Sequence, residues 1–394
     1  MNSFNYWTPT KVIFGADTAE QTGAEVKAFG GTCALLVYGG GSVVKSGLLD
    51  VVKKSLDLHG IGCICVGGVQ PNPLAEFAQK VADDNKGKGI DFVLGVGGGS
   101  VIDTAKSVAH GLANPSIEIW DLFALKESLS VSLPIGVVLT VAAAGSETSA
   151  SAVLTSQATG IKRGFTTQLN RPAFAIMDPA LTYTTPRIHT VAGIVDIFMH
   201  TLDRYFAPET DNALTDAIAE ALMRVVIENG KLVLEDPRSY KARSELMWAG
   251  SLSHNGLTGL GQPMDFAVHQ LGHALSAKYG ISHGMSLSAS WPAWARFVFR
   301  KDIARFVKYA RSVWGVSEPD DEAAASAGIE ATVRFFRDIG APVTLSEAVG
   351  SDVAVDIGEL VDICTFRGTR TIGAFKVLGA DDIREIYRLA LASQ

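Results

Sequence analysis

Two segments in the second half of the chain carry histidines and a carboxylate at helical spacing. Asp196 and His200 are four residues apart in an apolar stretch, and His269 and His273 repeat that spacing farther along. Residues four apart share one face of a helix, and His283 follows the second pair. Burying an unpaired carboxylate among apolar side chains is costly. The pattern therefore favours a divalent metal ion, which would offset this cost.

The donor types narrow the choice of metal. One carboxylate with several imidazoles suits Zn²⁺ or Fe²⁺ rather than Mg²⁺ or Ca²⁺. A single histidine is more often a hydrogen-bonded core residue, but four in helical register favour the metal. Spacing alone does not decide which of these histidines stays outside the coordination sphere. The other four, His59, His110, His189 and His254, have no such neighbours in the sequence.

A glycine-rich turn, Gly97-Gly98-Gly99-Ser100, joins an expected strand, Phe92–Val96, to an expected helix, Val101–Ala113. Glycines let the backbone approach a diphosphate, and a helix N-terminus attracts anions. The turn lacks the spacing of both the GxGxxG fingerprint and the Walker A motif. A plain tight connection is the alternative, but the position of the turn favours phosphate binding.

A second turn of this kind, Gly39-Gly40-Gly41-Ser42, follows the first long apolar run. Enzymes that use NAD usually bind its ribose 2′-hydroxyl with a carboxylate side chain, which would repel the 2′-phosphate of NADP. No acid occurs from Cys33 to Leu49, whereas Ser42 and the nearby Lys45 could accept the phosphate. The turn therefore favours NADP over NAD, with an ordinary flexible loop as the alternative.

The elements around these residues indicate two domains. Residues 1–187 are expected to form an α/β dinucleotide-binding domain with a Rossmann-like parallel sheet, because short apolar runs alternate with helical patterns. Residues 188–394 are expected to form an all-helical metal-binding domain, with the boundary near Pro186. The expected strands are Cys33–Tyr38, Gly62–Val66, Phe92–Val96 and Ile135–Thr140, and the helices between them are Val43–His59, Pro73–Asn85 and Val101–Ala113. The expected helices of the second domain are Val191–Phe206, Ala213–Ile227, Tyr240–Ser253, Phe266–Ala277, Ile303–Trp314, Asp321–Ile339 and Asp381–Ala392.

Composition excludes several classes of protein. The 394 residues are 47% apolar and carry a net charge of -7, so no basic face for nucleic acid is expected. The apolar stretches are shorter than the roughly 20 residues of a membrane-spanning helix. The N-terminus resembles no signal peptide, so a cytoplasmic location is expected. Cys63 and Cys65 alternate along one apolar run. A cluster ligand is one reading of this pair, but a buried structural role is favoured.

Together these motifs resemble the iron-containing, or group III, alcohol dehydrogenase family, most closely its NADPH-dependent butanol dehydrogenase and aldehyde reductase branch. The resemblance spans essentially the whole chain. The resemblance rests on the Gly97–Ser100 turn and on the pairs Asp196 with His200 and His269 with His273. It also rests on Asp103 with Lys106, Gly145-Ser146-Glu147, Asp178-Pro179 and His283-Gly284.

The resemblance implies roles for individual residues. Asp196, His200, His269 and His283 would hold the metal, while His273 would lie near nicotinamide and substrate as the catalytic residue. The residues implied for NADP(H) are Gly39, Gly40, Gly41, Ser42, Gly97, Gly98, Gly99, Ser100, Asp103, Thr140, Ser149, Lys162 and Leu181. The family is typically dimeric through N-terminal strands, which would place 12–15 at an interface.

Three positions depart from the family pattern. Asp203 replaces a glutamate, and we expect it to matter only for local packing. Ala144 replaces a hydroxyl-bearing residue and Ser149 an asparagine, so details of the cofactor cleft differ. The expected reaction is reversible hydride transfer between NADPH and an aldehyde whose oxygen the metal polarises. A lyase resembling dehydroquinate synthase, and a non-catalytic nucleotide-binding protein, are the alternatives.

Overall fold

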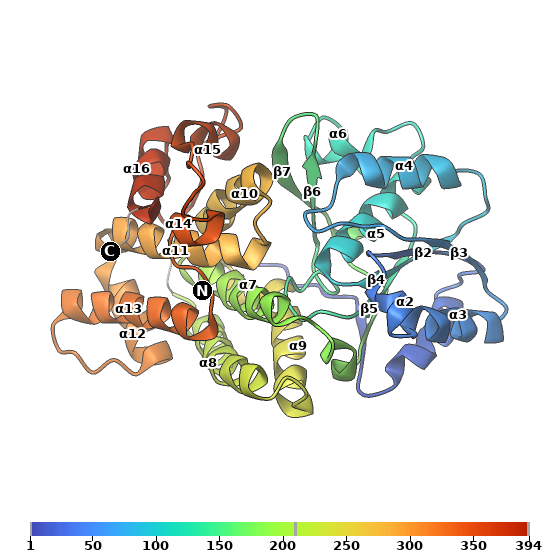
Figure 1. Cartoon of the computed structure of the whole chain (residues 1–394), viewed down its shortest axis with the longest axis horizontal. Helices are drawn as coiled ribbons and strands as arrows, with labels where there is room; N and C mark the ends of the chain where they lie inside the picture. Colours follow the sequence, from blue (N-terminus) through green and yellow to red (C-terminus); the bar gives the residue numbers. More distant parts are fainter. Residues whose placement is uncertain (1, 209–210, 392–394) are drawn as a thin grey trace. The chain divides into compact units, whose positions relative to one another are not determined.

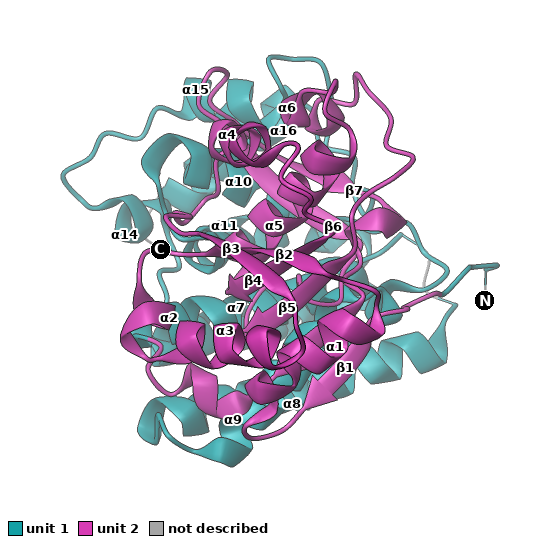
Figure 2. Cartoon of the chain, turned by 90° about the vertical axis from the view of Figure 1, so that its right-hand side faces the viewer, with its two compact units in different colours: residues 1–6, 186–394 teal, residues 7–185 magenta. Residues whose placement is uncertain are grey.

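The computed structural model describes residues 2–208 and 211–391, and the chain forms two compact units. Residues 7–185 form one, called here the α/β unit. Residues 1–6 and 186–394 form the other, called the helical unit (Figures 1 and 2). The division falls between Thr185 and Pro186, two residues before the division expected from sequence.

A six-stranded sheet, parallel throughout, is the framework of the α/β unit. Its order is β1-β8-β5-β4-β2-β3. The strands are β1 (Lys11–Phe14), β2 (Cys33–Tyr38), β3 (Gly62–Val66), β4 (Phe92–Gly97), β5 (Ile135–Leu139) and β8 (Phe174–Met177). An antiparallel hairpin, β6 (Ser151–Ser156) and β7 (Ile161–Thr166), forms a second sheet. Because the strands of the main sheet are parallel, the turns after β2 and β4 lie at one edge of it.

Helices cover both faces of the main sheet. Along β2, Leu35 and Val37 belong to one buried cluster, while Ala34 and Leu36 belong to another, as alternation along a strand requires. The first cluster includes α4 (Ala75–Asn85), α5 (Gly99–Ala113) and α6 (Ile119–Phe123). The second includes α1 (Thr22–Ala28), α2 (Ser42–Lys45) and α3 (Leu48–Leu58). Two-sided burial explains the continuous apolar runs of these strands.

Two expectations for the α/β unit are wrong in detail. The helix expected over Val43–His59 is broken into α2 and α3 by Gly47, whose φ of 79° lies in the left-handed region. The expected burial of Cys63 and Cys65 also fails, because β3 is an edge strand: Cys63 is half-buried and Cys65 is exposed. The strand β8 and the hairpin were not anticipated from the sequence pattern.

Helix α7 (Arg187–Tyr205) is the central element of the helical unit. It is buried continuously from Thr190 to Tyr205 and packs against its four neighbours α8, α9, α10 and α11. The remaining helices are α8 (Ala213–Glu235), α9 (Tyr240–His254), α10 (Ala267–Tyr279), α11 (His283–Val298), α12 (Ile303–Trp314), α13 (Asp321–Ile339), α14 (Leu345–Val349), α15 (Ile357–Cys364) and α16 (Ala380–Leu391). Short 3₁₀ turns occur in both units. Those of the α/β unit are η1 (Thr18–Gln21), η2 (Gln168–Asn170) and η3 (Pro179–Thr182), and those of the helical unit are η4 (Leu257–Gly259) and η5 (Phe299–Lys301).

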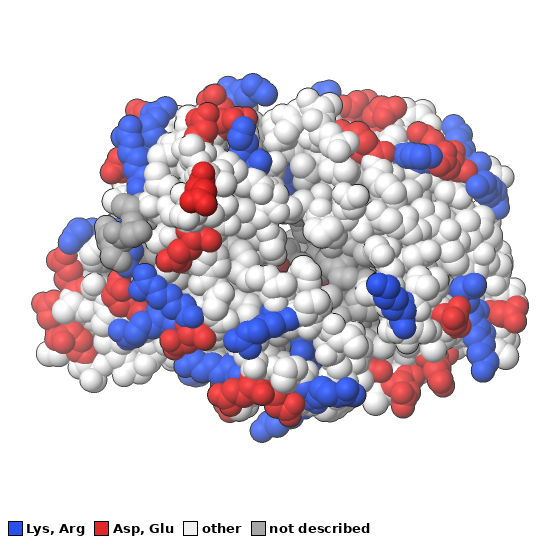
Figure 3. All heavy atoms as spheres, in the orientation of Figure 1, with Lys and Arg blue, Asp and Glu red and all other residues white. Residues whose placement is uncertain are grey.

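The helical pattern located most of these helices but missed α11, α14 and α15. Helix α8 runs on to Glu235, beyond the expected Ile227. The expected end of the last helix, Ala392, lies outside the described residues. No helix of the described ranges is long and apolar enough to cross a membrane. On the face drawn in Figure 3, basic and acidic side chains are interspersed rather than gathered.

Candidate metal centre and cofactor loops

Helix α7 presents a row of polar side chains inside an otherwise apolar helix. Asp196, His200 and Asp203 follow one another at intervals of four and three residues, so they share one face. All three are buried, with at most 4% of their surface exposed. A charged row of this kind is stable in a core only when partners satisfy it.

The partners come from the two helices that follow. His269 lies in the first turn of α10, and His283 is the first residue of α11. One potential ligand atom from each of Asp196, His200, His269 and His283 lies within 4.8 Å of the others. The Oδ1 atom of Asp196 is 3.4 Å from His200 Nδ1 and 3.6 Å from His283 Nε2. The structure thus brings together the four residues expected to hold the metal.

Glycine at position 284 allows α11 to approach α7. A Cβ atom built on Gly284 would lie 2.0 Å from the carbonyl oxygen of Ala192, which is one turn before Asp196. Backbone atoms cannot yield as a flexible side chain does, so a larger residue would push the two helices apart. The absence of a side chain at position 284 therefore sets the position of His283.

The protonation of His200 suits a metal ligand. Burial lowers the pKa of His200 well below its ordinary value, and the neighbouring His254 and His269 lower it further. His200 is therefore neutral at physiological pH, as a metal ligand must be. The Nε2 atom of His269 is buried and has no hydrogen-bond partner within the described ranges. These donors fit a divalent cation of the zinc or iron type.

Asp203 sets the orientation of one of these imidazoles. Its Oδ2 atom lies 2.6 Å from His269 Nδ1 and also accepts a hydrogen bond from the backbone N–H of His269. In the tautomer that donates from Nδ1 to this carboxylate, the lone pair of Nε2 is directed into the cluster. The expectation that Asp203 matters only for packing is therefore wrong. Its spacing from His200 on α7 was the available signal.

Replacing Asp203 by alanine is expected to lower metal affinity about 10- to 100-fold, because the His269 imidazole loses its orienting acceptor. Competition with a chromophoric chelator measures this affinity. The exposed Asp338, which pairs only loosely with Lys231 on the surface, provides the matched control Asp338→Ala. Equal affinities in the two variants would show that Asp203 does not support the site.

Two further histidines lie beside the cluster. His273, one turn after His269, has its ring centroid 5.2 Å from that of His283, and it is not among the four clustered donors. His254, at the end of α9, packs edge-on against His200 with ring centroids 4.1 Å apart. Sequence spacing gave no indication of His254, because it is far from both histidine pairs along the chain.

In the α/β unit, the predicted phosphate turn lies between β4 and α5. A Cβ atom on Gly97 would lie 2.6 Å from a methyl group of Val101, so this position accepts only glycine without a shift of the helix. Gly98 precedes the first residue of α5, Gly99, and Ser100 follows in the first turn. Thr140, which comes directly after β5, donates its backbone N–H to the carbonyl of Gly97. Thr140 and the glycine turn are therefore adjacent.

The second turn leads from β2 into α2. Gly39 and Gly40 follow the strand, and Gly41, with φ at 121°, precedes Ser42 at the start of the helix. A Cβ atom on Gly40 would meet no atom within 4 Å. This turn and the β4 turn lie at the carboxyl edge of neighbouring strands, where ligands bind in open α/β sheets.

A buried lysine holds the loop next to the β4 turn. The Nζ atom of Lys106 donates to the carbonyls of Ser146 and Ser151, each at 2.7 Å. Asp103 accepts from Ser146 Oγ at 2.6 Å and from the N–H of Val153. Burial lowers the pKa of Lys106 to about 8, although Asp103 opposes this shift. Lys106 therefore remains charged at neutral pH and can anchor this loop.

The other predicted cofactor residues occupy varied settings. Ser149 is buried, and its hydroxyl interacts with Ser151. Lys162 donates to the Asn72 side chain at 2.9 Å. Leu181, in η3, packs against the cluster that covers the second face of the sheet. Asp103 and Ser149 thus make contacts within the unit, and their direct contact with a cofactor stays a prediction.

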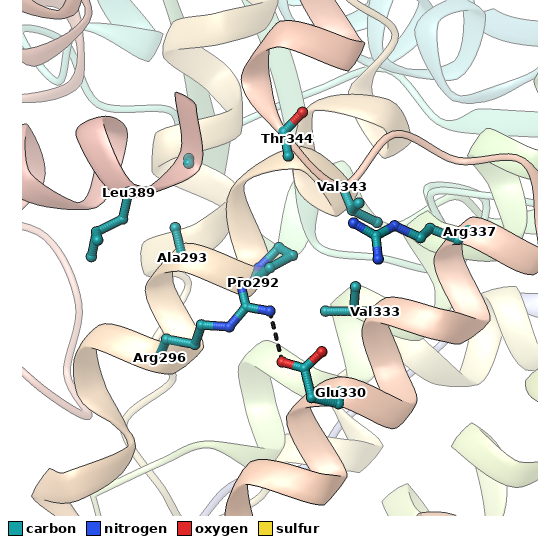
Figure 4. Close-up of a pocket in the computed structure, with 10 residues that line it drawn as sticks. Pro292, Ala293, Arg296, Glu330, Val333, Arg337, Val343, Thr344 and Leu389 are labelled. Carbon is teal, nitrogen blue, oxygen red and sulfur yellow. Dashed lines mark hydrogen bonds and ion pairs between the residues drawn. The ribbon is translucent and has the colours of Figure 1, made fainter. Parts of the chain in front are cut away.

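A pocket elsewhere in the helical unit contains none of these residues. It has a volume of about 250 Å³ and is lined by parts of α11, α13 and α16 and the chain before α14 (Figure 4). Arg296 and Glu330 form an ion pair of 2.7 Å along its wall. The metal cluster is therefore a separate feature.

Comparison with known proteins decides the family. The model of the iron-containing alcohol dehydrogenase family matches residues 9–179, and that of the family's C-terminal domain matches residues 190–391. The chain belongs to the iron-containing alcohol dehydrogenases. The resemblance noted in the sequence is thereby confirmed.

Relatives within the iron-containing alcohol dehydrogenases align over nearly the full chain. A probable NADH-dependent butanol dehydrogenase 1 of Bacillus subtilis is 37% identical, covering 99% of this chain and all of that one. The NADPH-dependent aldehyde reductase YqhD of Escherichia coli is 35% identical, with coverage of 99% and 100%. The crystal structure of NADH-dependent butanol dehydrogenase A from Thermotoga maritima is 36% identical, with a TM-score of 0.95 and coverage of 100% and 99%.

Proposed function

We propose that this protein is a metal-dependent oxidoreductase that interconverts aldehydes and primary alcohols with a nicotinamide cofactor. The observation that carries the proposal is the buried cluster of one carboxylate and three imidazoles, with ligand atoms within 4.8 Å of one another. Membership of the iron-containing alcohol dehydrogenases and the butanol dehydrogenase and aldehyde reductase relatives support the same reaction.

The residues of the helical unit hold the metal and move a proton. Asp196, His200, His269 and His283 bind the ion, which is Fe²⁺ or Zn²⁺ by the nature of its donors. When bound, such an ion polarises a substrate oxygen as a Lewis acid, and a reduced nicotinamide carries the hydride. His273, beside His283 but outside the donor set, supplies the proton that the alcohol product needs.

The residues of the α/β unit bind and orient the cofactor. The N-terminus of α5 and the Gly97–Ser100 turn hold the diphosphate, because backbone N–H groups and the helix dipole favour an anion there. Lys106 keeps the adjacent 145–151 loop in one conformation through hydrogen bonds to its carbonyls. Binding energy at these turns orients the nicotinamide without any protein nucleophile.

The experiment that tests the reaction follows the absorbance of NADPH, and separately of NADH, with butanal as substrate. The assay is repeated after chelation and after Fe²⁺ or Zn²⁺ is added back. Oxidation that disappears on chelation and returns with metal supports the proposal. Absence of oxidation with a panel of aldehydes and alcohols, in protein shown to bind metal and cofactor, would favour the lyase resembling dehydroquinate synthase.

NADPH is the preferred cofactor in this proposal. No acidic residue occurs between Cys33 and Leu49, the segment that contains the turn after β2. Ser42 begins α2, which also carries Lys45. The backbone N–H groups of the glycine turn, the Ser42 hydroxyl and the Lys45 charge suit a 2′-phosphate. The named relatives include both NADH- and NADPH-dependent enzymes, so they do not select between the two cofactors, and the proposal is based on this turn.

Replacing Gly40 by aspartate is expected to lower the ratio of kcat/KM with NADPH to that with NADH by at least about tenfold, because like charges placed together cost more than 1.4 kcal/mol. The position has room for the side chain, so the change adds charge without a clash. Gly40→Ala is the matched control and should keep the original ratio. An unchanged ratio in the aspartate variant would mean that this turn does not contact the phosphate.

A further inference from the structure

Two cysteines lie side by side on the exposed edge of the sheet. Cys63 and Cys65 are separated by one residue on β3, so both side chains point to the same face. Their Sγ atoms are 3.6 Å apart. β3 pairs only with β2, which leaves its other edge open among the described strands. Cys65 is exposed and Cys63 is half-buried, so a ligand from solvent can reach both sulfurs.

The pair is prepared for deprotonation. The hydrogen bond from the Cys63 thiol lowers the pKa of Cys65 to about 7, and the charge of Lys53 on α3 lowers it further, while burial opposes the shift. The same hydrogen bond, together with burial, raises the pKa of Cys63. Near neutral pH the two sulfurs therefore share one proton, which Cys63 donates to the Cys65 thiolate.

The sulfur separation suits a metal ion better than a disulfide. With metal–sulfur bonds of about 2.3 Å, two ligands of a tetrahedral ion lie about 3.8 Å apart, close to the 3.6 Å found here. A disulfide needs its sulfurs at about 2.05 Å and its Cα atoms at most about 6.8 Å apart. The Cα atoms of residues i and i+2 on a strand are about 6.6 Å apart, which is near that limit.

We propose that Cys63 and Cys65 form a two-thiolate site for a soft divalent metal ion, separate from the Asp196 cluster. On binding, the ion takes the place of the shared proton: two metal–sulfur bonds form, the Cys63 S–H bond breaks, and the proton goes to solvent. Water or an added thiol completes the coordination. The site is independent of the proposed reaction, because neither cysteine belongs to the cofactor turns or to the helical unit.

Cys33 is the natural control for this site. In the register of the sheet, Ala34 of β2 is opposite Cys63, so the Ala34 side chain shares the face of the thiol pair. Cys33, the preceding residue, therefore points to the other face. It is close in space to the pair yet cannot be a third ligand.

The probe for this site is Cd²⁺, added to full-length protein whose Asp196 cluster is already loaded with Zn²⁺, in a phosphine reductant. Thiolate-to-metal charge-transfer absorption reports sulfur ligands alone, and proton release is measured in weak buffer. We expect one Cd²⁺ per chain and about one proton released at pH 8, as the shared proton requires.

Cys65→Ser should abolish most of the charge-transfer band and weaken Cd²⁺ binding at least about 100-fold, because the chelating pair is reduced to one thiol. Cys63→Ser should do the same, and Cys33→Ser should bind like wild type. Each variant should retain aldehyde reduction, so failure of the reaction and failure of this site are told apart. A band that persists when both Cys63 and Cys65 are serine, or wild-type affinity no tighter than that of a single-thiol variant, overturns the proposal.

Discussion

Replacing His269 by alanine is expected to remove the metal and the activity together. The variant loses one of four clustered donors, and Asp203, which is fully buried, loses the imidazole that it orients. A bound metal stabilises the charge that develops in the transition state by several kcal/mol. Loss of this stabilisation corresponds to a fall in kcat/KM of about 10³-fold or more. Metal content by elemental analysis and NADPH oxidation with butanal are the measurements.

The control for this variant is His189→Ala. His189 is exposed in the first turn of α7, on the same helix as Asp196, and it is not among the four clustered donors. Near-ultraviolet circular dichroism of both variants separates loss of the site from loss of the fold. Full activity in metal-free His269→Ala protein would overturn the proposed mechanism.

Replacing Gly284 by alanine is expected to weaken metal binding although it changes no donor atom. The added methyl group would overlap the carbonyl of Ala192, so α11 must move away from α7. His283 begins α11 and lies 3.6 Å from Asp196, so the movement separates two of the donors. Overpacking of this kind typically costs about 1–3 kcal/mol.

Two measurements check the Gly284→Ala prediction. We expect metal affinity to fall at least about tenfold, because a loss of 1.4 kcal/mol of binding free energy is enough for that change. The melting temperature should fall as well. Gly379→Ala is the matched control, because a Cβ atom at that glycine meets nothing within 4 Å. Wild-type metal affinity and melting temperature in Gly284→Ala would show that α11 tolerates the displacement.

Sequence pattern located the elements that repeat a simple period and missed those that do not. Asp196 and His200 could be placed on one helix face because α7 is continuous and apolar. Helix α11 has no amphipathic period, since it is buried almost throughout. It also contains Pro292, and serines such as Ser286 and Ser290 bond back to its own carbonyls. The family resemblance, and not helical spacing, therefore predicts His283 as a ligand.

Residues whose roles depend on tertiary contacts are harder to predict from the sequence. Asp203 has a helical spacing that could have linked it to His200, but its partner, His269, is 66 residues away. His254 reaches His200 only because α9 packs against α7. The apolar strand predicts Cys65 in the core, because no local signal marks β3 as an edge strand. In each case the deciding contact joins segments that are distant in sequence.

The clustered donors also couple the folding of the helical unit to the supply of metal. The cluster is assembled from three helices, α7, α10 and α11, so the unfolded chain offers no equivalent site. A ligand that binds only the folded state stabilises it by about 2.7 kcal/mol at a concentration 100 times its Kd. The midpoint of thermal unfolding should therefore rise with free Zn²⁺ or Fe²⁺. In metal-starved cells this protein would be lost by unfolding and proteolysis as well as by inactivity.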